Sequence, residues 1–258
     1  MPNPKRATET VGWTPRTDPK GMFSSGIPDL DRVLGGGFRR GSFALYHVDE
    51  LVAPDDLRRL FTPTWLNFLY QSRGLIAVLP ARETAAGFRA ALLDHVSRRL
   101  FDSRVRVVTY AGEDESAPYI VSLRVGGAGA KGSAGGREES MNKMERAERA
   151  ARGAGPKPII EFTSLEVLEV VAGAETAARM YFHGVKRVRE VGNLGLGVAR
   201  PGLACVDAVR SMMDYEFQLR RTTSGLLLSG IRPAFAAHLV VPDLARGRPH
   251  IALVPAAA

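Results

Sequence analysis

The stretch "SGIPDLDRVLGGGFRRGSFALYHVDELVAPDDLRRL", residues 25–60, decides the fold of this chain. It predicts a short helix beginning at Pro28, because proline is favoured in the first helical turn. A triple-glycine turn at 35–37 and a buried strand at 42–48 follow, and a helical pattern starts at residue 55. A strand leading through a short loop into a helix is the arrangement of a phosphate-binding loop. This loop has no glycine and no lysine.

The same alternation of apolar runs and amphipathic stretches continues along the chain. It is typical of βαβ units and of a mainly parallel sheet. The last part differs, because "DYEFQLRRTTSGLLLSGIRP" and "AAHLVVPD" predict strands joined by a tight turn, an antiparallel addition to the sheet edge. The predicted strands are 42–48, 74–80, 104–110, 157–163 and 193–199, and the predicted helices are 55–73, 84–100, 138–152, 173–191 and 203–214.

Charge and composition limit the kinds of partner. The chain of 258 residues has 35 Lys and Arg against 27 Asp and Glu, a net charge of +8. Such a surplus favours anionic partners such as nucleic acid, acidic proteins or lipid headgroups. The basic residues are spread along the chain as isolated pairs such as Arg39–Arg40 and Arg220–Arg221. We therefore favour general solubility over a dedicated nucleic-acid surface, and nucleic acid stays an open alternative.

The location expected from the sequence is the cytoplasm. No run of about 18 apolar residues predicts a membrane span, and the start of the chain lacks the apolar segment of a secretory signal. The single cysteine, Cys205, excludes an internal disulfide framework and fits a reducing compartment. It lies in an apolar helical stretch, where we expect a buried small side chain.

Three regions of different character are predicted. Residues 1–20 hold several prolines and little apolar content, and we expect a flexible or draped arm. Residues 21–258 are expected to form a single domain. Within it, residues 126–157 combine a glycine-rich linker with a charged helix and a second linker. Charged pairs three or four residues apart predict that this helix faces solvent, with a partner-binding role as the alternative.

The stretch "SGIPDLDRVLGGGFRRGSFALYHV" resembles the entry to the core domain of the RecA-like ATPases of the KaiC/RadA branch. "VLPARETAAGFRAAL", "IIEFTSLEVL" and "LRRTTSGLLLSGIRP" resemble, in the same order, the strand and helix with the catalytic glutamates, the Walker B strand and the terminal hairpin. The resemblance covers roughly 21–123 and 157–245. It implies an α/β class, RecA-like three-layer fold with a mainly parallel central sheet and a C-terminal antiparallel hairpin.

The residues at the place of the Walker A loop do not suit a triphosphate. A phosphate loop needs converging backbone N–H groups and a lysine. Here four carboxylates would repel the phosphates, and proline removes a donor. We interpret the acids as an ordinary helix start, with Asp55 or Asp56 as a cap. The residues of this degenerate loop region are Asp49, Glu50, Pro54, Asp55 and Asp56.

The other positions implied by the resemblance are only partly kept. Glu83 follows Arg82 where the family has two acids; a base or a helix cap are its two interpretations. Thr163 stands where the family has its magnesium-linked aspartate. Glu161, two residues earlier on the same strand face, is a substitute that we doubt. We regard Glu83, Glu161 and Thr163 as vestigial.

The terminal hairpin and the histidines add little chemistry. Gly230 stands where the family has a lysine acting across subunits. Arg232 matches an arginine that reaches the neighbouring subunit, and we expect it at an interface or strand edge. The five histidines show no metal-ligand spacing, so no metal site is predicted.

Three functions remain in view. The first is a catalytically inactive RecA/KaiC-like pseudo-ATPase, a regulatory, scaffolding or assembly subunit with a protein partner or further copies of itself and no cofactor. The second is an unusual ATP-binding protein in which Arg58, Arg59 and a helix N-terminus hold phosphate and Mg-ATP binds. The third is a DNA-binding accessory of the recombinase-paralogue kind. Signal transduction, motility assembly, gas-vesicle regulation and recombination are all compatible with KaiC-like relatives.

Overall fold

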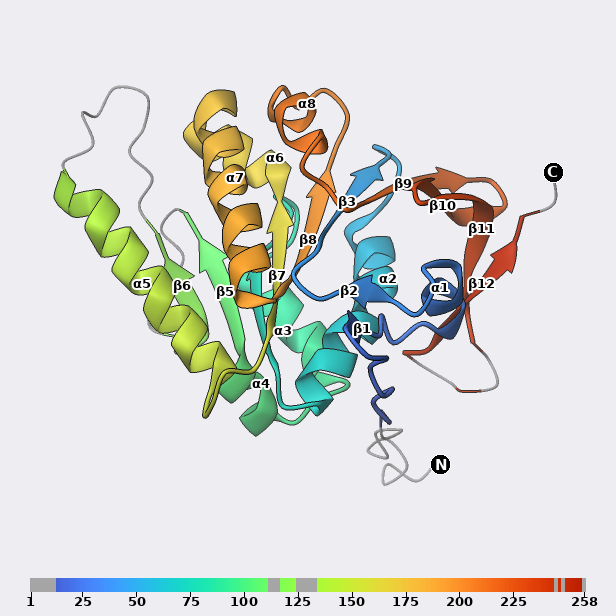
Figure 1. Ribbon diagram of the computed structural model, residues 1–258, viewed down its shortest axis with the longest axis horizontal. Helices are drawn as coiled ribbons and strands as arrows, with labels where there is room; N and C mark the ends of the chain where they lie inside the picture. The colour runs from blue at the N-terminus through green and yellow to red at the C-terminus, as the bar shows by residue number, and fades with distance from the viewer. Residues whose placement is uncertain (1–12, 111–116, 124–133, 244–245, 247–248, 257–258) are drawn as a thin grey trace, which may run out of the picture.

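The computed structural model describes residues 13–110, 117–123, 134–243, 246 and 249–256. Within them a ten-stranded sheet runs through the molecule in the order β12-β11-β10-β9-β3-β8-β7-β4-β5-β6 (Figure 1). Strands β9 to β6 of this order are parallel, and β9 to β12 are antiparallel, so the predicted mainly parallel sheet with an antiparallel end is confirmed. The strands are β3 (Phe43–Val48), β4 (Gly74–Val78), β5 (Val105–Thr109), β6 (Ile120–Ser122), β7 (Ile159–Ser164), β8 (Leu194–Ala199), β9 (Tyr215–Thr222), β10 (Gly225–Arg232), β11 (Ala234–Pro242) and β12 (Ile251–Pro255).

Helices cover both faces of the parallel part, which gives three layers (Figure 1). One face packs against α2 and α3 through a large apolar cluster. The other packs against α6, α7 and α8 through a second cluster. Alternate residues of β3 show this division, since Tyr46 belongs to the first cluster and Leu45 to the second. The helices are α1 (Pro28–Val33), α2 (Pro54–Tyr70), α3 (Ala85–Leu93), α4 (Arg98–Arg104), α5 (Ala134–Arg152), α6 (Leu165–Ala172), α7 (Ala174–Val191) and α8 (Cys205–Arg210).

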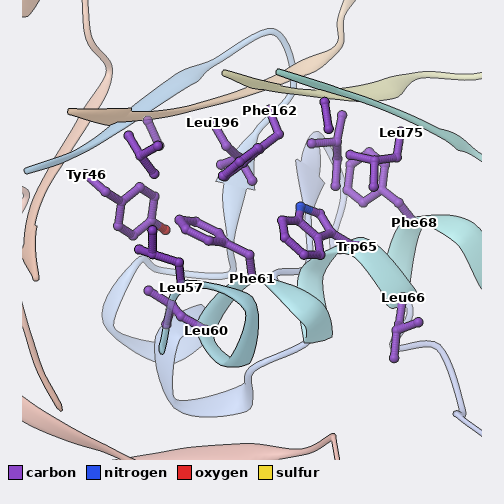
Figure 2. Close-up of a cluster of buried hydrophobic side chains, with 14 of the residues drawn as sticks. Tyr46, Leu57, Leu60, Phe61, Trp65, Leu66, Phe68, Leu75, Phe162 and Leu196 are labelled. Carbon is purple, nitrogen blue, oxygen red and sulfur yellow. The ribbon is translucent and has the colours of Figure 1, made fainter. Parts of the chain in front are cut away.

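Helix α2 is held to the sheet by aromatic side chains (Figure 2). Phe61 makes edge contacts with Tyr46 of β3 and Phe162 of β7, at ring-centroid distances of 4.8 and 5.1 Å. Trp65, one turn further along, also meets Phe162 at 5.3 Å. Each such pair adds about 1 kcal/mol beyond the burial of its area. The start of α2 is therefore fixed relative to the end of β3, where the candidate site lies.

The predicted first helix and glycine turn are confirmed. Helix α1 begins at Pro28, and the strands on either side of it in sequence, β1 (Met22–Phe23) and β2 (Phe38–Arg39), pair into a two-stranded sheet. Asp31 on α1 is buried and accepts hydrogen bonds from Ser25 N–H at 2.7 Å and from both neighbouring serine hydroxyls. Gly37 has φ of +121°, and a Cβ there would lie 2.3 Å from a carbonyl oxygen of β1, so the turn requires glycine.

The charged insert has a different environment from the expected one. Most of the predicted glycine-rich linker, residues 126–133, lies outside the described residues, and the residues that follow it already belong to α5, which begins at Ala134. The helix, α5, does not simply face solvent, because Ala147 and Ala151 are buried and Ala151 packs against the sheet beside β4. Gly74 permits this, since a Cβ there would lie 2.5 Å from the carbonyl oxygen of Ala151. Arg149, on the outer side of α5, is exposed. The helix is thus part of the layered structure.

Other boundaries differ from the sequence-based expectation. The helix predicted over 84–100 is two helices, because α3 ends at Leu93 and the Ser97 hydroxyl caps α4 by accepting from Leu100 N–H at 3.2 Å. Helix α6 and strands β1, β2, β6 and β12 were not predicted. Of the predicted arm, residues 1–12 lie outside the described residues. Trp13 is buried and stacks on His250 at 4.5 Å, so the described part of the arm is draped over the body.

Candidate functional site

Ligands of open α/β sheets bind at the carboxyl edge of the strands, where neighbouring strands send their helices to opposite faces. This sheet has two such positions. Strand β3 leads to α2 on one face while its neighbour β8 leads to α8 on the other. Likewise β4 leads to α3, and its neighbour β7 leads to α6 on the opposite face. Candidate site residues lie near both positions.

At the first position lies the segment 49–53, the place of a phosphate loop. Four of its five backbone N–H groups are engaged inside the protein. Asp49 N–H donates to the Leu219 carbonyl at 2.9 Å, and Val52 N–H donates to the Asp49 carbonyl at 3.1 Å. Leu51 N–H donates to Asp49 Oδ1 at 3.0 Å. Ala53 N–H donates to the Asp56 carboxylate at 3.3 Å. These donors do not converge on a common point, as a phosphate cradle requires.

The carbonyl groups of the same segment converge on an arginine. Arg200, which follows β8, donates from Nη1 to the Asp49 carbonyl at 2.7 Å and to the Glu50 carbonyl at 3.2 Å. Its Nη2 donates to the Val52 carbonyl at 2.9 Å. The segment thus presents acceptors to a cation, the opposite polarity to a loop that binds an anion. We call residues 49–53 together with Arg200 the arginine-bound loop.

Two predicted candidates pair with each other at the start of α2. Arg58 forms ion pairs with Asp55 and with Glu83, whose side chain is 3% exposed. Burial raises the pKa of Glu83, while the hydrogen bond and charge of Arg58 act in the opposite direction. The helix cap expected at Glu83 is instead Thr84, whose hydroxyl accepts from Gly87 N–H at 3.0 Å. Arg58 is thus held by two carboxylates.

The cap predicted at the start of α2 is confirmed at Asp56. Its side chain accepts from Ala53 N–H and also receives Arg221 of β9 at 3.0 Å. Asp56 is buried, whereas the side chain of Asp55 is 77% exposed. Pro54 occupies the first turn of the helix, where its missing N–H leaves no bond unmade.

Arg59 lies apart from the arginine-bound loop. It is exposed and lines a cavity of about 370 Å³ on the outer side of α2. Arg58, His95 and His250 also line this cavity, but so do the carboxylates Asp55 and Asp94. The positive and negative side chains are therefore mixed.

The two candidates on β7 occupy different surroundings. Glu161 is buried and accepts from Asn193 Nδ2 at 2.7 Å; Arg187 of α7 lies 3.4 Å away and also pairs with Glu148 of α5. This network joins α5 and α7 to the sheet. Thr163 lies nearer the carboxyl end of β7, half-buried between its neighbouring strands.

The hairpin candidates lie on β10. Arg232 donates to the Met213 carbonyl of its own chain at 2.8 Å. Gly230 lies at a register shift, where a Cβ would come within 2.2 Å of the Phe235 ring and 2.3 Å of the Pro233 carbonyl oxygen. A lysine there would therefore displace the strand that follows.

At the second position the structure has a crevice of about 250 Å³, which we call the open crevice. Its lining is mainly apolar, and Val170 at its edge is 79% exposed. Three polar residues also line it: Glu83, Thr109 and Tyr110. The apolar lining residues are Leu79, Pro80, Ala81, Ala85, Val107, Val108, Val167, Val170 and Val171.

The described part of the chain has neither a metal-binding cluster nor a membrane-spanning helix. Its histidine, cysteine, aspartate and glutamate side chains form no group of three that could hold a metal ion. None of its helices has the length and apolar character needed to span a bilayer. Cys205 is buried and free, as expected, and burial raises its pKa to about 12.

Sequence reasoning missed Arg200 and Thr109. Arg200 follows a buried strand and precedes Pro201–Gly202, but nothing local indicates that it binds a loop some 150 residues earlier. Thr109 ends a predicted strand. The only available signal was its position, since side chains at the carboxyl end of a parallel strand lie where ligands bind.

Comparison with known proteins gives a partial match by sequence and a broad one by structure. The family model described as GvpD basic region 2 matches residues 12–126, which include the 49–53 segment and Glu83 but not Arg200. The protein GvpD1 of Halobacterium salinarum is 41% identical over 107 residues, which are 41% of this chain and 20% of that protein. GvpD2 of the same organism is 37% identical over 102 residues, 39% of this chain and 20% of that protein. The match thus spans about a fifth of the length of these relatives.

The structural likeness extends over nearly the whole chain. A KaiC-like protein from the hyperthermophilic archaeon Pyrococcus horikoshii OT3 superposes with a TM-score of 0.56 at 12% identity. The alignment covers 91% of this chain and 99% of that one. At this identity the likeness establishes the fold alone. Together with the strand order and the layers described above, it shows that the chain has the RecA-like fold of the KaiC-like proteins.

Proposed function

We propose that this chain is a pseudo-ATPase, a RecA-like domain that acts as a regulatory, scaffolding or assembly subunit without hydrolysing nucleotide. The observation that carries the proposal is the arginine-bound loop, in which three carbonyl groups accept from Arg200 where a phosphate loop would direct N–H groups at an anion. A triphosphate placed there would meet acceptor oxygens and the nearby carboxylates of Asp49 and Glu50. Both repel the phosphate charges.

The residues present do not fit Mg-ATP at this loop. No lysine follows residue 49 in the loop or the first turns of α2 to contact the phosphates. Glu83, the candidate base, is already paired with Arg58. Thr163 has a hydroxyl where a carboxylate would coordinate magnesium through water. We therefore derive no catalytic step through a nucleotide.

The regulatory role rests on relatives and fold together. RecA-like domains need no hydrolysis to pack against a partner. The GvpD family model matches the part of this chain that contains the 49–53 segment, and Arg200 lies outside the match. Among the processes open to KaiC-like proteins, these relatives favour gas-vesicle regulation. Since the match covers about a fifth of their length, the process belongs to the proposal.

A second candidate, nucleotide binding outside the loop, has one supporting observation. The arginines Arg58 and Arg59 line the same cavity of about 370 Å³. The two carboxylates in that lining and the pairing of Arg58 with Asp55 and Glu83 oppose it. Arg59 alone is left to contact phosphate.

DNA binding is supported less well than the net charge suggests. Several arginines donate to backbone carbonyls of their own chain. Arg104 donates to the Ala151 carbonyl at the end of α5, and Arg189 donates to the Met212 carbonyl. A guanidinium used in this way is less available to phosphates. A gel shift with an affinity that falls steeply with salt would favour DNA binding over the pseudo-ATPase proposal.

Calorimetry with Mg-ATP and with Mg-ADP tests the proposal, run on the full chain beside size-exclusion chromatography. We expect no binding heat at about 100 μM protein and no change in thermal midpoint. If heat is observed, Arg59→Glu and the control Arg82→Glu locate it, because both arginines are exposed and only Arg59 lines the larger cavity. Heat that survives in both variants but disappears with loop changes at 49–53 overturns the proposal.

A further inference from the structure

The open crevice is a site without an assigned role. It lies where β4 and β7 send their helices to opposite faces, the position that favours ligand binding in such sheets. Valine side chains of α6 form one wall, and residues 79–85 form another. Val170 at its edge exposes 79% of its surface, more than any other large apolar residue of the described chain. Apolar surface of this kind is favourable to bury.

The polar atoms in the crevice define what an occupant must supply. The Thr109 hydroxyl is buried and has no hydrogen-bond partner in the described residues. An unpaired buried hydroxyl destabilises the protein, and a ligand that bonds to it removes that cost. Glu83 is a carboxylate whose charge is balanced by Arg58, so the site favours a neutral occupant. That occupant must therefore be apolar and must carry a hydrogen-bonding group.

The size of the crevice indicates whether its occupant is a small molecule or a side chain of another polypeptide. Its volume of about 250 Å³ lies below the roughly 300–1,000 Å³ of small-molecule sites. It suits one anchor side chain, the kind of residue that dominates protein interfaces when it fills a pocket. We propose that the open crevice binds a single apolar side chain of a partner polypeptide, together with the adjoining main-chain amide. This inference rests on the proposed regulatory function, because it names how the partner would be recognised.

The test uses methyl NMR on the full chain, with N-acetyl-leucine methylamide as the probe. We expect saturable shifts confined to the methyl groups of Leu79, Val167 and Val171, with a dissociation constant of about 1 mM. N-acetyl-lysine methylamide, which has the same amides and a charged end, should give no saturable shift. Isobutanol serves as a small molecule with the same apolar group. Binding of isobutanol as tight as that of the amide would overturn the polypeptide assignment.

Two variants locate the binding. Ala81→Phe fills the crevice from an exposed position and should abolish the shifts, whereas Ala150→Phe on the outer side of α5 should leave them unchanged. Thr109→Val removes the hydroxyl with little change of shape and should weaken the leucine probe about fivefold while isobutanol is unaffected. Absence of saturable shifts with the folded wild-type chain overturns the inference. The pseudo-ATPase proposal would stand after that result, because its own test is the nucleotide titration.

Discussion

The arginine-bound loop and the open crevice lie at the same edge of one sheet and differ in what satisfies their polar atoms. In the loop, the chain supplies its own ligand, since Arg200 meets three carbonyl groups. In the crevice, the Thr109 hydroxyl lacks a partner among the described residues, and apolar walls stay partly exposed. The fold provides equivalent positions at both places. The difference shows that one edge of a sheet can be filled by the protein's own side chain at one position and remain open to a ligand at another.

Replacing Arg200 tests whether its hydrogen bonds to the three carbonyl groups hold the arginine-bound loop in place, and it should have the largest effect. Arg200→Ala should lower the free energy of unfolding by about 3 kcal/mol, because three carbonyl groups lose a charged donor. Arg200→Lys should recover less than half of this loss, since an ammonium lacks the planar fork. Urea denaturation measures both. A loss below about 1 kcal/mol for the alanine variant would mean that the loop holds its shape without the guanidinium.

The Arg58–Glu83 ion pair links the two regions, because Arg58 lies in the helix that follows the loop and Glu83 lines the open crevice. Arg58→Met should cost about 2 kcal/mol, because the buried Glu83 carboxylate loses its charge partner while solvent still reaches part of Arg58. The double variant Arg58→Met/Glu83→Met should be more stable than the single one. An additive result, with no recovery in the double variant, would contradict the pairing.

The pKa of Glu83 gives a pH test. Since burial raises this pKa in the folded state above its ordinary value of 4.5, the native state holds the proton more tightly than the unfolded state. The contribution of Glu83 to stability is therefore greatest below pH 4.5 and is lost as the pH rises through the folded-state pKa. Glu83→Gln should remove the loss of stability that the ionisation of Glu83 causes. The stability difference between variant and wild type should therefore change between pH 4.5 and the folded-state pKa of Glu83. Thermal midpoints at several pH values measure it; a constant difference would contradict the raised pKa.

The smallest expected effect is at the open crevice. Thr109→Val should raise the free energy of unfolding by about 1 kcal/mol, because it replaces an unpaired buried hydroxyl with a methyl group. Thr84→Val is the matched control, and it should be destabilising because the Thr84 hydroxyl caps α3. If Thr109→Val destabilises instead, the hydroxyl already has a partner and the crevice is less receptive than we propose.

Local patterns were sufficient to predict most of the fold. Apolar runs predicted the parallel strands β3, β4, β5, β7 and β8, and the resemblance of 25–48 to KaiC-like proteins predicted the layers, because both depend on residues close in sequence. Helix α6 was missed because it follows β7 directly and the apolar run continues across the boundary. Strand β12 was missed because only pairing with β11 identifies its short apolar run.

The candidate site was predictable only in part. The acids and the missing lysine at 49–56 indicated an altered loop, and the cap at Asp56 followed from helix chemistry. The reason for the loop's conformation was not predictable, because Arg200 lies about 150 residues away and acts through backbone atoms, which leave no pattern in the sequence. The same limit applies to the Arg58–Glu83 pair, whose members were assigned separate roles.

The close approach of α5 to Gly74 of β4 has a consequence for the design of shortened variants of this protein. The segment resembles a dispensable appendage, rich in charge and bordered by glycine-rich sequence. Yet it shields Ile76, Val108 and Ile159 on the sheet beneath it. Deleting residues 134–152 would expose these aliphatic side chains of the sheet to solvent and should promote aggregation. Trimming should spare the helix and be confined to sequence outside it.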